Sequence, residues 1–150
     1  IKEWDHEHSL DWHLLDYPDH QNLQRWVRDL NHFYCSHPAL FSQDFEPEGF
    51  SWIDCHDTDN SVLSFLRRDK DKNTLAIVCN FTPVPRYDYT VGLPQPGLWH
   101  EVLNSDAHIY GGSNSGNFDP VQATEPGSHN LPYSVKLTLP PLAIIFLLNQ

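Results

Sequence analysis

The sequence predicts an all-β fold, an antiparallel β-sandwich, preceded by a single α-helix. Beyond residue 45, short apolar segments of strand length alternate with turn-forming residues, which is typical of sandwiches. Before that point, one segment repeats its apolar side chains at helical spacing. The chain also has 12 prolines, which favour short segments with fixed turns over several long helices.

The predicted helix covers residues 21–34. Its apolar side chains recur at helical spacing, with charged side chains between them, at Leu23, Trp26, Val27, Leu30 and Tyr34. Asp19 can cap its start. Pro38 predicts an end near His37, because the residue before a proline disfavours helical backbone. The segment before the helix, residues 9–15, is too apolar for a free tail and is expected to pack against something.

Six strands are expected, at residues 61–67, 75–81, 87–91, 98–103, 134–139 and 142–148. A polar turn at residues 69–73 joins the first two as a hairpin. Pro83 and Pro85 end the second strand, because proline cannot donate to a sheet. Residues 105–129, rich in Gly, Ser and Asn, are expected to form a long flexible surface loop. The domain boundary is predicted near Ser42, which gives domains at 1–42 and 43–150.

The charge of the chain excludes some partners. Its 20 acidic and 9 basic residues give a net charge of −11. Such a field repels a nucleic-acid backbone or an anionic membrane surface, whereas a neutral sugar polymer is indifferent to it. The longest apolar run, residues 142–148, is far shorter than the roughly 20 residues of a membrane-spanning helix. We therefore expect neither a nucleic-acid nor a membrane partner.

Three cysteines, an odd number without framework spacing, argue against a disulfide-stapled secreted fold and favour the reducing cytoplasm. The chain begins at Ile1 and contains no methionine. We therefore expect it to be a piece cut from a longer protein.

Nine segments, in order and spread across nearly the whole chain, together resemble the C-terminal part of 1,4-alpha-glucan branching enzymes of the alpha-amylase clan. The most distinctive is CNFTPVPR at residues 79–86. The others lie at residues 3–4, 9–15, 24–31, 45–52, 60–68, 101–106, 110–113 and 137–143.

This resemblance implies an architecture. The family has an N-terminal β-sandwich, a central (β/α)₈ barrel and a C-terminal β-sandwich. The resemblance makes residues 1–42 the end of the barrel domain, with its last helix, and residues 43–150 the C-terminal sandwich. The apolar face of the helix is then expected to pack on the catalytic barrel, an intramolecular partner.

The resemblance also implies a reaction without placing it in this chain. The family cleaves an α-1,4 bond of a glucan and passes the chain to a 6-hydroxyl, which forms a branch. Its catalytic carboxylates lie on the barrel, upstream of Ile1. No catalytic residue is therefore expected here, and the chemistry requires no cofactor or metal. The chain alone is expected to be an inactive, monomeric part of a glycosyltransferase that acts on glycogen or amylose.

Two tryptophans are the candidate glucan-binding residues. Trp52 is expected between the segment at residues 45–50 and the first strand, where an exposed indole can stack on a sugar. The alternative is that Trp52 seals the junction between helix and sandwich. Trp4 could border the active-site face of the barrel, or pack on it as Trp12 is expected to do. Trp99 alternates with Leu98 and His100 in a strand and is expected in the core.

Other polar clusters indicate no site. The histidines near the start of the chain are His6, His8, His13 and His20. No pair of cysteines accompanies them, so the spacing of a structural zinc site is missing and no metal site is expected. Three aspartates, Asp54, Asp57 and Asp59, lack the glycine and distal glutamate of a calcium loop. They are expected in a solvated turn before a strand.

Two further functions stay open at this point. The chain could be a stand-alone carbohydrate-binding module, in which Trp52 and its neighbours bind sugar by themselves. It could also be a purely structural domain that stabilises a barrel without touching glucan. Binding of a maltooligosaccharide to the chain discriminates between them.

Overall fold

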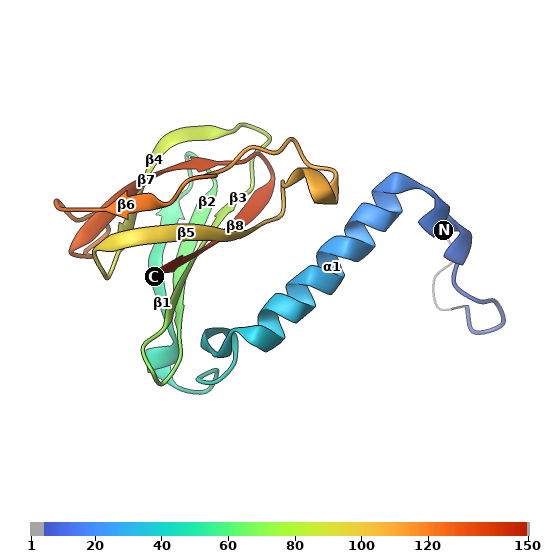
Figure 1. The fold of residues 1–150 in the computed structure, drawn as a ribbon, viewed down its shortest axis with the longest axis horizontal. Coiled ribbons are helices and arrows are strands. Elements are labelled where there is room, and N and C mark those ends of the chain that lie inside the picture. The colour runs from blue at the N-terminus through green and yellow to red at the C-terminus, as the bar shows by residue number, and fades with distance from the viewer. Residues whose placement is uncertain (1–4, 150) are drawn as a thin grey trace.

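The computed structural model describes residues 5–149 and shows a β-sandwich with one long helix beside it (Figure 1). One sheet has six strands in the order β1-β2-β3-β8-β5-β6, and the other has two, β4 and β7. Every pairing within the two sheets is antiparallel. The predicted fold class, an antiparallel β-sandwich preceded by one helix, is confirmed.

The strands are β1 (Phe50–Asp57), β2 (Val62–Arg68), β3 (Thr74–Asn80), β4 (Arg86–Leu93), β5 (Gly97–Asn104), β6 (Val121–Ala123), β7 (Tyr133–Leu139) and β8 (Ala143–Asn149). The helices are the α-helix α1 (Pro18–Ser36) and the short 3₁₀ segments η1 (Trp12–Asp16), η2 (Pro38–Leu40), η3 (Pro47–Gly49) and η4 (His108–Tyr110). No helix in residues 5–149 is long and apolar enough to cross a membrane.

The helix α1 ends as predicted but begins differently. Its C-cap is His37, directly before Pro38. Its N-cap is Tyr17, whose side chain makes no capping hydrogen bond, so the predicted cap at Asp19 is wrong. Pro18 occupies the first helical position, where its fixed φ suits the helix and its missing N–H is no loss. Asp19 lies inside the first turn, where its negative charge interacts favourably with the positive end of the helix dipole.

Two strands were not expected from the sequence. The edge strand β1 contains Trp52, Asp54 and Asp57, so the predicted solvated turn is wrong for these two aspartates, whereas Asp59 does lie in an exposed turn before β2. An edge strand tolerates carboxylates because one of its sides has no partner strand. The short strand β6 lies within the predicted loop at 105–129, which also contains η4. That segment is thus partly regular, and the prediction of an unstructured loop is wrong there.

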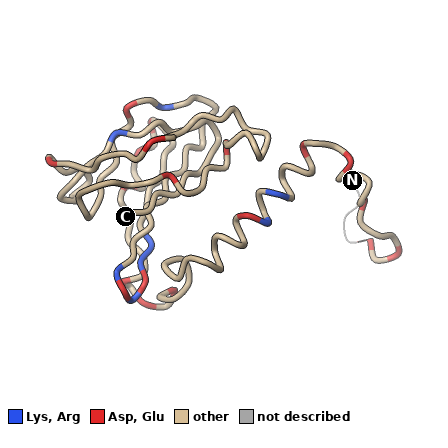
Figure 2. Tube along the Cα trace, in the orientation of Figure 1, with Lys and Arg blue, Asp and Glu red and all other residues tan. Residues whose placement is uncertain are grey.

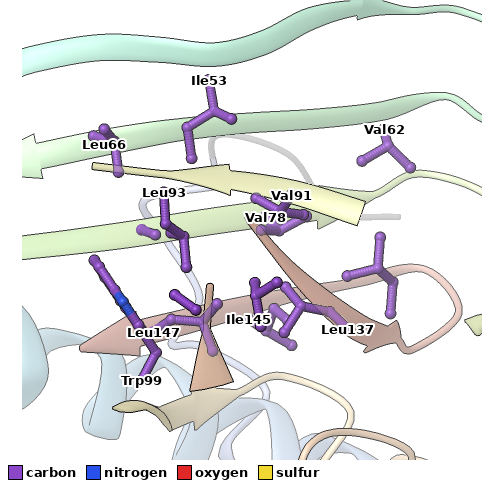
Figure 3. Close-up of a cluster of buried hydrophobic side chains, with 14 residues drawn as sticks. Ile53, Val62, Leu66, Val78, Val91, Leu93, Trp99, Leu137, Ile145 and Leu147 are labelled. Atoms are coloured by element: carbon purple, nitrogen blue, oxygen red, sulfur yellow. The ribbon is translucent and has the colours of Figure 1, made fainter. Parts of the chain in front are cut away.

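The main core lies between the two sheets (Figure 3). Side chains from both sheets fill it, among them Ile53, Val62, Leu66, Val78, Val91, Leu93, Trp99, Leu137, Ile145 and Leu147. Trp99 is fully buried, and its indole N–H donates to the carbonyl of Gln95 at 3.3 Å. This hydrogen bond satisfies the polar atom of an otherwise apolar ring. The prediction that Trp99 belongs to the core is confirmed.

A second apolar cluster covers the outer face of the six-stranded sheet. Ile77 of β3 and Phe146 of β8 are buried there, and Trp26, Leu30 and Phe33 of α1 pack against this cluster. The strand β3 is apolar on both faces, which indicates a strand covered on both sides. The sequence assigned the whole apolar face of the helix to an absent barrel. Instead, part of that face covers this sheet.

The segment around η4 ties α1 to the sandwich. Arg25 donates to the carbonyl of Ile109 at 3.1 Å, and the hydroxyl of Tyr110 donates to Asp29 at 3.1 Å. The rings of Trp26 and Tyr110 meet edge to face, with their centroids 5.1 Å apart. These contacts fix the orientation of α1 on the sheet.

Candidate functional site

Trp52 lies on the outer face of the edge strand β1. Strand alternation explains its direction, because the next residue, Ile53, points into the core. Trp52 stands opposite Phe65 of β2 and is 51% exposed. An indole held on a strand and half open to solvent can offer one ring face to a ligand.

Two phenylalanines hold this indole in place. Phe50 meets Trp52 edge to face, with a centroid separation of 5.0 Å and an interplanar angle of 87°. Phe65 meets it in the same way, at 5.9 Å and 81°. We call Phe50, Trp52 and Phe65 the aromatic platform. Because both phenylalanines lie nearly perpendicular to the indole, they do not extend its plane, and the exposed indole is the flat part of the platform that can stack on one sugar ring.

The cations next to the platform already have partners. Arg67, opposite Phe50 in the sheet, forms an ion pair with Asp44 and donates to the carbonyl of Leu40 at 2.8 Å. Arg68 donates to the hydroxyl of Ser51 at 2.9 Å, and burial lowers the pKa of its guanidinium. Among residues 5–149, both cations next to the platform are thus engaged, and its chemistry suits a neutral ligand.

The other tryptophan candidates lie elsewhere. Trp4 lies outside the described residues. Trp12 is 62% exposed in η1 and borders an open depression of about 720 Å³ between η1 and α1. Leu10, Leu23 and Val27 line the same depression and are also exposed. We call the surface that these four residues form, Leu23 and Val27 on α1 with Leu10 and Trp12 packed before it, the free face of α1. The structure does not bring Trp12 and Trp52 together, because η1 lies beyond the N-terminal end of α1, far from β1 (Figure 1).

One of the three aspartates, Asp57, forms a hydrogen bond that links the two sheets, and a second, Asp54, lies close to a histidine. The hydroxyl of Tyr89, on β4, donates to Asp57 at 2.5 Å, and Asn60 donates to the same carboxylate. Burial acts to raise the pKa of Asp57, but these hydrogen bonds outweigh it, so that the pKa is lowered. The imidazole of His129 lies 3.6 Å from Asp54 and accepts the Gly92 N–H at 3.1 Å. The Asp57 carboxylate therefore helps to hold the two sheets together.

Within residues 5–149, no group of three or more His, Cys, Asp or Glu side chains is placed to hold a metal ion. The three cysteines, Cys35, Cys55 and Cys79, are free thiols. Burial raises the pKa of the Cys79 thiol to about 11, which keeps it protonated and unreactive at neutral pH. The exposed aromatic surfaces are therefore the candidate binding sites of the described chain.

The fold and these surfaces define an antiparallel all-β domain that carries one docked helix and an exposed aromatic platform. The family described as "Alpha amylase, C-terminal all-beta domain" matches residues 52–150, and the chain belongs to this family.

Relatives extend the match to the residues before the sandwich. The chain is 54% identical over 151 aligned residues to "1,4-alpha-glucan branching enzyme GlgB" of Aquifex aeolicus. This alignment covers 100% of this chain and 24% of that protein. It is 55% identical over 145 residues to the protein of the same name from Cereibacter sphaeroides, covering 97% of this chain and 20% of that protein. The chain thus spans about a quarter or less of the length of these curated relatives.

A solved structure confirms the fold. The alpha-amylase from H. orenii superposes with a TM-score of 0.50 at 18% identity, over 84% of this chain and 20% of that one. At this identity the likeness is one of fold, and it agrees with the sandwich predicted from the sequence.

Proposed function

We propose that this chain is the non-catalytic C-terminal region of a 1,4-alpha-glucan branching enzyme in the cytoplasm. The observation that carries the proposal is an identity of 50–55% with three proteins of that name, over almost the whole chain. The parent would cleave an α-1,4-linked glucan and transfer the released chain to form an α-1,6 branch. Retention of configuration in such a transfer needs two carboxyl groups about 5–5.5 Å apart, which a barrel outside this chain would supply.

In this proposal α1 joins two domains. Its inner side chains pack on the sandwich, and its free face offers an apolar surface to the catalytic barrel. The exposure of Trp12 and Leu23, at 62% each, supports this role, because adjacent large apolar side chains in solvent mark an interaction surface. The boundary near Ser42 then separates the two domains in sequence, although α1 packs on both.

The second part of the proposal is that Trp52 contacts glucan. The aromatic platform supports it, since the indole is exposed, braced and free of competing charge. This contact is tested by isothermal titration calorimetry of the chain with maltoheptaose. Trp52→Ala should abolish most of the binding heat. Trp12→Ala is the matched control, because it removes an indole that is at least as exposed from another surface. Equal binding by both variants would contradict the role of Trp52.

Activity assays test the first part. The chain alone, incubated with amylose, should form no α-1,6 linkages, because the carboxylate pair lies on the barrel. Addition of the upstream region on the same polypeptide should produce branching. New α-1,6 linkages formed by the pure chain would overturn the proposal and place an active site in the sandwich. If the chain binds no glucan but stabilises the parent against heat, the purely structural alternative holds.

A further inference from the structure

A depression of about 500 Å³ opens where α1 passes the end of β3 and the start of β8. Trp26 forms one wall, Cys79 and Ile144 belong to the floor, and Phe81 and Leu142 form the rim. Trp52 does not line it. Its volume falls within the range of about 300–1,000 Å³ that is usual for small-molecule sites.

A buried asparagine fixes the shape of the rim. Asn80, only 2% exposed, donates to the carbonyls of Val84 and Pro140, both at 2.9 Å. Its carbonyl oxygen accepts the N–H and the hydroxyl of Thr82, at 3.1 and 2.8 Å. One side chain thereby holds both turns that carry the rim residues. A rim fixed before a ligand arrives loses less conformational entropy on binding.

The rim holds two apolar side chains in solvent. Phe81 is 60% exposed and Leu142 is 68% exposed. Leu142 adopts a φ of +47°, a left-handed conformation that disfavours a branched side chain. Its N–H donates to the carbonyl of Thr82 at 2.8 Å, which maintains this conformation. Backbone strain that serves to display an exposed apolar residue is more typical of a binding site than of a surface turn.

The chemistry of the lining selects a neutral ligand. Of the described residues that line the depression, none is charged, although the chain as a whole has a net charge of −11. Lysines and acidic residues gather instead at the β2–β3 hairpin, the opposite end of β3 (Figure 2). Anions are repelled by the overall field, and cations find no carboxylate in this lining. The hydroxyl of Ser105 accepts the Ile144 N–H at 2.9 Å, which leaves its own proton for a ligand oxygen.

We propose that this depression binds a segment of α-1,4-glucan, at a site separate from Trp52. Each glucose ring has an apolar face that can lie on Phe81 or Trp26, and hydroxyls that can accept from Ser105. The wall is rigid, because Tyr110 braces Trp26 edge to face. The choice of glucan over other neutral ligands rests on the proposed function of the protein. An apolar segment of another protein domain is the competing occupant.

The test is a titration of the ¹⁵N-labelled chain with maltoheptaose to about 10 mM, within the range of weak binding. Saturable shifts are expected at the indole N–H of Trp26 and at the amides of Phe81 and Ile144. Phe81→Ala should weaken this binding about tenfold, since it removes a stacking ring. The matched control is Phe118→Ala, which removes a ring that is 75% exposed and does not line the depression. It should leave the affinity unchanged.

Leu142→Gly provides a variant that cannot fail through misfolding of the turn, because glycine accepts a positive φ. It should weaken binding several-fold while the chain stays folded. Shifts confined to the surroundings of Trp52 would overturn this second site and leave the proposed function intact. An affinity that Phe81→Ala does not change would also overturn it, because Phe81 would then take no part in glucan binding. Failure of the proposed function would show differently, as a parent protein without branching activity.

Discussion

The two sides of α1 should respond oppositely to truncation. Phe33 faces the sheet, where its ring meets Phe146 edge to face, with the centroids 5.2 Å apart. Val27 lies on the free face and is 48% exposed. We therefore compare Phe33→Ala with Val27→Ala, two truncations to the same residue within one helix. Any difference between them reports on what each side contacts, since both variants keep the backbone of α1.

The structure sets the two magnitudes. Full burial of a phenylalanine makes its truncation cost about 3–5 kcal/mol. Phe33 is half-buried, so we expect a loss of about 2–3 kcal/mol, which includes the edge-to-face pair with Phe146. Val27→Ala removes little buried area, and alanine favours a helix over valine by roughly 0.5 kcal/mol. In the isolated chain this second variant should be as stable as the original or slightly more stable.

Urea denaturation, followed by tryptophan fluorescence and by far-ultraviolet circular dichroism, measures both free energies of unfolding. The two signals should change together, because α1 and the sheet share one apolar cluster. A loss below about 1 kcal/mol for Phe33→Ala, or equal losses for both variants, would refute the packing of α1 on the sandwich.

Three further predictions concern the sandwich. Trp99→Ala should lower the free energy of unfolding by about 3–5 kcal/mol in the same urea assay, because a fully buried ring leaves a cavity. Asn80→Ala should lower it by about 2–4 kcal/mol and broaden the amide resonances of both rim turns, since four hydrogen bonds are lost; a loss under 1 kcal/mol would contradict this role. The pKa of Asp57 is lowered in the folded chain, so its carboxylate stabilises the fold above about pH 4, and this contribution disappears as the pH falls through the folded pKa. Asp57→Asn should therefore reduce the acid dependence of thermal unfolding, and an unchanged pH profile would refute this.

Local sequence signals predicted the central strands correctly. The segments that became β2 and β3 combine β-branched and apolar residues with a polar turn, and the structure pairs them as the expected hairpin. Trp99 was assigned to the core from its position in an alternating segment. Pro38 predicted the helix end because it acts on the residue next to it. These features depend on neighbours in sequence, which is why the sequence was sufficient.

Contacts between segments that are distant in the sequence could not be predicted from local sequence patterns. Asp57 finds its hydroxyl donor on Tyr89, 32 residues away, and no pattern near Asp57 predicts that pairing. The strand β1 was missed because its polar residues resemble a turn, although Phe50 and Trp52 alternate with Ser51 and Ile53 as strand residues do. That alternation also placed Phe50 beside Trp52, and it was the available signal for the aromatic platform. The bracing by Phe65 required the register of β1 with β2.

The placement of α1 explains why an all-β domain would accompany a barrel. Most of the stability of a helix in a protein comes from the packing of its apolar side chains, so the free face of α1 would be poorly defined without support. The sheet supplies that support through Leu30 and Phe33, and η4 adds fixed contacts through Tyr110. A substitution of Phe146 in the sheet should therefore loosen α1 and weaken any contact made through the free face. In the proposed arrangement, the sandwich would stabilise the catalytic barrel through α1, even where it makes no contact with glucan.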